Sequence, residues 1–73
     1  MTSINYEVTL LDKDGNMLAW DDKDTIEECK EFANDYVRRT NAAEAIVKIR
    51  KQTLIDYEDH FSIKYDIVEE YNV

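Results

Sequence analysis

Few residues of this chain carry side chains that could do nucleophilic, acid–base or metal chemistry. His60 is the only histidine and Cys29 is the only cysteine. Catalysis needs a second reactive group held beside such a residue in a cleft, and 73 residues leave little room for one. A structural zinc site needs four ligands, mostly Cys and His, and an internal disulfide needs two cysteines. We therefore expect no enzymatic activity, no cofactor and no metal site.

The segment from Asp12 to Asn16 has alternating oxygen-bearing side chains around the only glycine, Gly15. This spacing is weakly similar to a calcium loop, but an EF-hand needs twelve residues, a final glutamate and flanking helices. Both flanks here have the composition of strands. Glycine behind an aspartate favours a hairpin turn, because Gly adopts positive φ without steric cost.

Acidic side chains are concentrated between residues 21 and 35. On a helix that rises about 1.5 Å per residue, such acids form a band of negative charge comparable in pitch with the phosphates of a DNA duplex. The alternative interpretation is an ordinary solvated helix face. The carboxylates belong to Asp21, Asp22, Asp24, Glu27, Glu28, Glu31 and Asp35.

Two aromatic residues, Phe32 and Tyr36, lie one turn apart on the same predicted helix. They are displaced sideways from its apolar stripe, so they either complete the core or form an interface. Carboxylates beside an aromatic site suit a basic partner with a protruding apolar side chain, such as a DNA-repair glycosylase that inserts a wedge into the duplex. The candidate partner-binding residues are Phe32, Tyr36, Glu28, Glu31, Asp35 and Asp24.

The elements that must position these residues follow from hydrophobic periodicity. Alternation predicts strands over 4–11, 17–20, 45–50 (extending as far as Tyr57) and 61–67. Helical spacing of Ile26, Cys29, Ala33 and Val37 predicts a helix that ends near Thr40, with Asp24 as its cap and Glu27 as the partner in a capping box. We expect an α+β fold in a single domain over 1–73, with a small antiparallel sheet (β-β-α-β-β) and one helix packed on one face.

Charge narrows the classes of partner. Seventeen acids against nine bases leave a net charge of −8, which repels nucleic acids and anionic lipids and attracts basic proteins. The alternative is that the charge only aids solubility. No apolar run reaches the roughly 20 residues that span a bilayer, no signal peptide is present, and the lone cysteine suits a reducing compartment. We expect a cytoplasmic protein, in the host cytoplasm if a phage encodes it. Its small size favours a homodimer.

Several segments, taken in order, are similar to those of the short, dimeric uracil-DNA glycosylase inhibitors of Bacillus phages, which are DNA mimics. The resemblance covers about residues 5–52, and the segment 57–73 has no counterpart in the short family members. The matching features are the strand Tyr6-Glu7-Val8-Thr9 with Leu10 and Leu11, the turn Asp12-Lys13-Asp14-Gly15, the pair Phe32 and Tyr36, and Asn41-Ala42-Ala43-Glu44 leading into Ile46-Val47-Lys48-Ile49-Arg50.

The resemblance implies that Phe32 and Tyr36 line a groove for the wedge residue of the enzyme, while Glu31 and Asp35 face its basic residues. We therefore expect an acidic homodimer that inhibits a basic host DNA-binding protein by DNA mimicry, with uracil-DNA glycosylase as the named target. Two alternatives stay open. One is an inhibitor of another host target, such as a CRISPR effector, a restriction enzyme or RNA polymerase. The other is a structural or interaction subunit without an inhibitory role.

Overall fold

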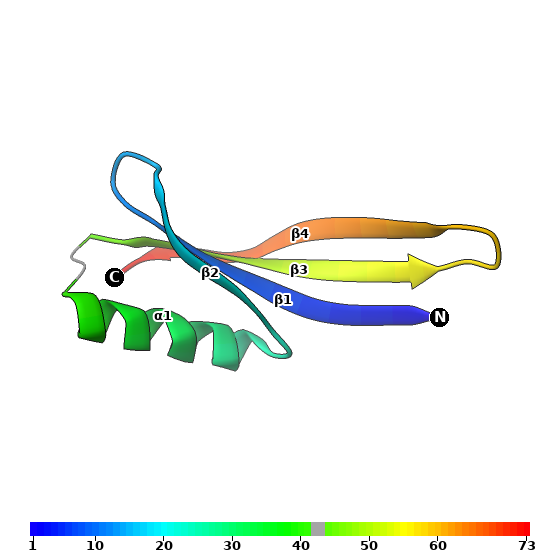
Figure 1. The fold of residues 1–73 in the computed structure, drawn as a ribbon, viewed down its shortest axis with the longest axis horizontal. Coiled ribbons are helices and arrows are strands. Elements are labelled where there is room, and N and C mark those ends of the chain that lie inside the picture. The colour runs from blue at the N-terminus through cyan, green and yellow to red at the C-terminus, as the bar shows by residue number, and fades with distance from the viewer. Residues whose placement is uncertain (42–43) are drawn as a thin grey trace.

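The computed structural model describes residues 1–41 and 44–73, and it contains four strands and one helix in these ranges (Figure 1). The elements follow the predicted order, strand, strand, helix, strand, strand. Their bounds are β1 Thr2–Leu11, β2 Met17–Lys23, α1 Ile26–Thr40, β3 Ile46–Asp56 and β4 Phe61–Asn72. The α+β prediction is confirmed. Ala42 and Ala43, part of the predicted approach to the third strand, lie outside the described residues.

The strands form one sheet in the order β2-β1-β3-β4, and every neighbouring pair is antiparallel. β4 pairs with β3 of its own chain, from Asp56 opposite Phe61 to Ile46 opposite Asn72. A register shift between Ile49 and Arg50 places one extra residue, Val68, in β4. Such a bulge reverses the faces on either side of it, so that Ile67 and Glu69 point in opposite directions.

The hydrophobic core lies between α1 and one face of the sheet (Figure 1). Cys29 and Ala33 from the helix are buried, as its spacing predicted, and Ile26 and Val37 are partly buried at its ends. They meet even-numbered residues of β1 and odd-numbered residues of β3, because side chains alternate between the faces of a strand. The fully buried strand residues are Val8, Leu10, Val47 and Ile49.

The start of α1 differs from the predicted start by one residue. Thr25, not Asp24, is the N-cap, with extended backbone angles (φ −135°, ψ 157°). Its hydroxyl accepts a hydrogen bond from the backbone amide of Glu28 at 3.1 Å and donates one to Glu28 Oε1 at 3.2 Å. Glu28 therefore occupies the position predicted for Glu27, but its carboxylate accepts from the hydroxyl of the capping residue. Asp24 and Thr25 are both good capping residues, so their local preferences did not decide between them.

The turn between β1 and β2 follows the prediction. Gly15 has a positive φ of 88°. The Asp12 carboxylate accepts hydrogen bonds from the backbone amides of Asp14 and Asn16, at 2.9 and 2.8 Å. These bonds, together with one from the Asn16 side chain, lower the pKa of Asp12. The Asp12 carboxylate thus closes the turn.

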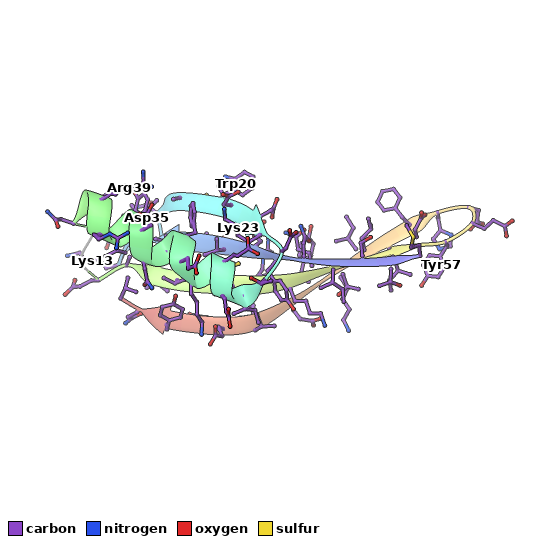
Figure 2. The ribbon with its side chains drawn as sticks, turned by 90° about the horizontal axis from the view of Figure 1, so that it is seen from below. Lys13, Trp20, Lys23, Asp35, Arg39 and Tyr57 are labelled. Atoms are coloured by element: carbon purple, nitrogen blue, oxygen red, sulfur yellow. The ribbon has the colours of Figure 1, made fainter. Side chains whose placement is uncertain are left out.

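The sheet extends well beyond the helix. Its Cα atoms span 47 × 22 × 15 Å, and α1 covers only one end of the longest dimension (Figures 1 and 2). We call the uncovered three-stranded part the arm; it consists of residues 2–5 of β1, 52–56 of β3 and 61–65 of β4. Tyr57 lies at its tip (Figure 2). We call the sheet face opposite α1 the far face.

Candidate protein-binding site

Four of the six predicted site residues line one shallow depression, of about 270 Å³, beside α1. Phe32 is partly buried at its base, where its ring packs against the core. Glu28, Glu31 and Asp35 come from neighbouring turns of the helix and line the same depression. The i, i+3 and i+4 spacing of these residues places them on one side of a helix, as the sequence predicted.

Lys23 also lines this depression, and the sequence interpretation missed it. Its ammonium lies 5.6 Å from the centroid of the Phe32 ring, within range of a cation–π contact, and 3.2 Å from a carboxylate oxygen of Asp21. The second strand was predicted to end at Trp20, but β2 continues to Lys23 and carries this residue to the helix. Polar residues without apolar alternation fill positions 21–23, so no periodic signal marked the continuation.

The three carboxylates at the depression have different surroundings. Asp35 pairs with Arg38 and Arg39 of the same helix, each at 3.0 Å, so its charge is largely compensated. Glu28 accepts the hydrogen bond from the Thr25 hydroxyl. Glu31 is exposed and, in the described part of the chain, forms no ion pair. Its charge remains available to a partner.

Tyr36 and Asp24 lie outside this depression. Tyr36 is partly buried and packs against the core one turn further along α1. Asp24 precedes the helix and lines a separate hollow with Tyr6 and Ile26. Figure 2 shows Asp35 on α1 and Lys23 near this helix, both at the end of the molecule opposite Tyr57. The structure thus gathers four of the predicted residues and leaves two as neighbours.

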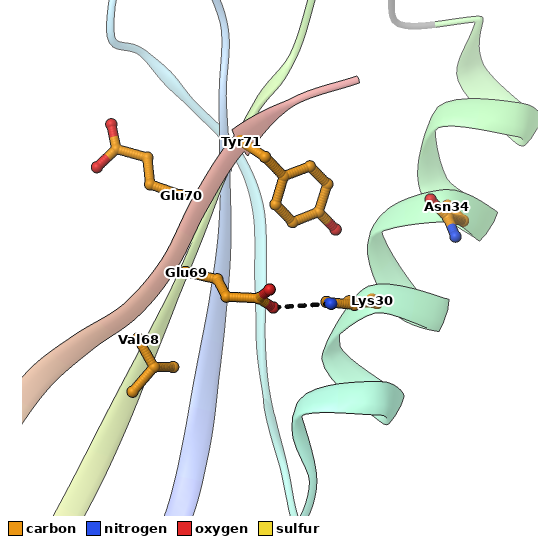
Figure 3. Close-up of a pocket in the computed structure, with 6 residues that line it drawn as sticks. All are labelled: Lys30, Asn34, Val68, Glu69, Glu70 and Tyr71. Atoms are coloured by element: carbon orange, nitrogen blue, oxygen red, sulfur yellow. Dashed lines mark ion pairs between the residues drawn. The ribbon is translucent and has the colours of Figure 1, made fainter.

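A second depression lies between α1 and the last residues of β4 (Figure 3). Lys30 Nζ lies 3.0 Å from Glu69 Oε2 across it. That oxygen is buried and accepts no hydrogen bond of regular geometry, so the ion pair compensates its burial. Burial also raises the pKa of Tyr71. These contacts fasten β4 to the helix, which is a structural role.

The other residues that could do chemistry have ordinary structural surroundings. His60 is exposed at the tip of the arm, where its ring stacks on Tyr57 with 4.5 Å between centroids and its Nδ1 lies 2.6 Å from Asp59 Oδ1. Cys29 is fully buried, and desolvation raises the pKa of its thiol to about 11. A thiol with this pKa stays protonated and is a poor nucleophile at neutral pH.

Within residues 1–41 and 44–73, no three His, Cys, Asp or Glu side chains are grouped to hold a metal ion. The helix in this part of the chain is too short and too polar to cross a membrane. Comparison of the chain with protein-family models, with curated proteins and with solved structures found no match.

Proposed function

We propose that this domain acts by binding rather than by catalysis, and that it inhibits a basic DNA-binding protein by imitating the charge of DNA. The proposed binding site is the depression beside α1, and the proposed target is uracil-DNA glycosylase. The observation that supports the proposal is a partly buried aromatic ring, Phe32, in one depression with three acidic residues, Glu28, Glu31 and Asp35.

Electrostatics supports this choice of partner. The chain carries a net charge of −8, and seven of its acids fall within residues 21–35, at the helix and at the adjoining end of β2. A surface of this sign attracts proteins whose own surfaces are positive because they bind phosphates. An apolar ring amid the acids would accept the wedge side chain that base-flipping enzymes insert into DNA.

The direct test is inhibition of uracil excision from DNA by a purified glycosylase. We expect near-complete inhibition at roughly stoichiometric protein, as for a partner bound with nanomolar affinity. A tenfold excess that leaves the rate unchanged would exclude uracil-DNA glycosylase as the target.

Charge-neutralising substitutions then test the site. Glu31→Gln removes an exposed, unpaired charge from the depression and should weaken inhibition by about tenfold, since a charge contact in an interface contributes about 1–2 kcal/mol. Glu58→Gln removes the same charge from the turn at the tip of the arm and should have no effect. Equal effects of the two substitutions would show that net charge, and not this site, determines inhibition.

Truncation of the rings is a less selective test. Phe32 and Tyr36 both pack against the core, so Phe32→Ala with Tyr36→Ala would destabilise the fold by about 2–5 kcal/mol as well as alter the site. Loss of binding in that variant would carry information only if circular dichroism showed the domain still folded. Glu31→Gln leaves the core intact and is the sharper experiment.

A further inference from the structure

The far face of the sheet carries a row of uncovered apolar side chains. Phe61, Ile63, Tyr65 and Ile67 alternate along β4, and their register with Asp56, Leu54, Gln52 and Arg50 of β3 places them opposite α1. Their exposed fractions run from 46% for Ile63 to 66% for Phe61. The alternation of these residues predicted a strand with one buried side. Nothing in the described chain buries that side.

Two further apolar side chains lie on the far face, one beside the row and one separated from it by Thr9, Glu7 and Arg50. Leu54 lies opposite Ile63 on β3, and Trp20 of β2, at 56% exposure, lies on the same face because its partner Thr9 points away from the core. Exposed apolar patches of this extent are rare on monomeric proteins unless they are interaction sites.

The far face carries charges of both signs: Lys48 and Arg50 lie among Glu7, Asp22, Asp56 and Glu70. Arg50 donates hydrogen bonds to Glu7 through its Nε, at 2.9 Å, and its Nη2, and its guanidinium lies 4.5 Å from the centroid of the Tyr65 ring. Lys48 lies directly opposite Glu70 on the neighbouring strand. Two acidic molecules of charge −8 would repel each other at their helices and far less at this face.

The area is on the scale of a stable association. Four strands about 4.8 Å apart, the longest of 12 residues at about 3.3 Å each, give a sheet face on the order of 600 Å² before side-chain relief is counted, and each partner in an interface of standard size buries about 800 Å². A symmetric dimer requires a patch that can pack against a copy of itself, and a row of aliphatic and aromatic side chains around paired charges meets this requirement.

We propose that a second copy of this chain packs on the far face, sheet against sheet, through Trp20, Leu54, Phe61, Ile63, Tyr65 and Ile67. Antiparallel sheets pack in this way at about 10 Å separation, with interdigitated side chains between them. Both helices then lie on the outside of the dimer with their carboxylates exposed. The inference stands independently of the proposed function, since it uses the opposite face.

Substitutions on the two faces of β4 test the proposal. Ile63→Asp places a charge in the row, whereas Ser62→Asp places the same charge one residue away on the opposite face of the same exposed strand. By analytical ultracentrifugation we expect the wild-type chain and Ser62→Asp to dimerise, and Ile63→Asp to dissociate at least about tenfold more readily. A wild-type chain that stays monomeric up to about 1 mM, or two variants that dissociate equally, would overturn the proposal.

A measurement on the wild-type chain covers the case in which Ile63→Asp fails to fold. Trp20 is the only tryptophan, so its fluorescence reports on this face alone. Dilution that halves the mass should shift its emission to longer wavelength as the indole becomes hydrated. Dissociation without any spectral shift would place the interface elsewhere, for instance along the open edge of β4, and would contradict the proposal.

Discussion

Glu31 and Asp35 lie one helical turn apart and line the same depression, yet they differ in what they can offer a partner. Arg38 and Arg39 already pair with Asp35, so a basic partner would have to displace them. Exposed ion pairs of this kind contribute little to stability, about 0–1 kcal/mol. Displacing them therefore costs little, but exchanging one cation for another adds little to the binding free energy. Glu31 needs no such exchange. At the residue scale, Glu31 is therefore the carboxylate on which binding should depend most.

Cys29 provides a prediction of pH dependence. Its pKa is raised from an ordinary 9.0 to about 11, so the folded state holds the thiol proton more tightly than the unfolded chain does. The associated stability is complete below pH 9 and is lost as the pH rises towards 11. Between neutral pH and about pH 10.5, the free energy of unfolding should fall by roughly 1–2 kcal/mol more in the wild-type chain than in Cys29→Ala. Urea unfolding at several pH values measures this difference, and parallel curves would contradict it.

At the scale of elements, periodicity predicted the helix and all four strands because each has an apolar alternation or stripe. The missed parts are those where polar residues or a bulge interrupt the pattern. β2 continues through Asp21, Asp22 and Lys23, and β4 continues to Asn72 past the bulge at Val68. The sheet order and the choice of face covered by α1 depend on contacts between distant segments, which local periodicity does not encode.

The same reasoning explains which parts of the candidate site were predictable. Glu28, Glu31, Phe32 and Asp35 share a helix, so their spacing alone brought them together. Lys23 joins them from β2, through the packing of the sheet edge against the helix. The far-face row was visible as an alternation, but whether its apolar side would be covered could not be read from β4 itself.

The corrected helix start gives a prediction at the same scale. Thr25→Ala removes the hydroxyl that accepts from the Glu28 amide and should destabilise the domain by about 1 kcal/mol. Asp24→Ala removes the neighbouring residue originally expected to cap the helix and should cost at most a few tenths of a kcal/mol through the helix dipole. Urea denaturation of both variants decides between the two caps, and the reverse order of stabilities would favour Asp24.

The whole molecule is polarised. Acids are concentrated on α1 and the adjoining end of β2, whereas the far face carries exposed apolar side chains and charges of both signs. The two associations proposed above use two different faces, one governed by charge and the other by burial of apolar area.

Salt should separate these associations. Raising sodium chloride from about 50 to 500 mM should weaken binding of the basic partner by tenfold or more, because charge contacts at an exposed site are screened. Self-association through the far face should change by less than about twofold, since apolar burial does not depend on charge. Inhibition assays and sedimentation across the same salt series measure both. Equal salt sensitivity would mean that the two associations share one surface.

The position of β4 at the edge of the sheet has a consequence for biosynthesis. In the described chain every fully buried residue lies between Val8 and Ile49, so all of them are synthesised before β4. The strand that carries the exposed apolar row is therefore made after β3, the strand with which it pairs. This exposed, aggregation-prone strand is therefore present for a shorter time than it would be if it preceded the core residues. The shorter exposure limits incorrect pairing with other nascent chains.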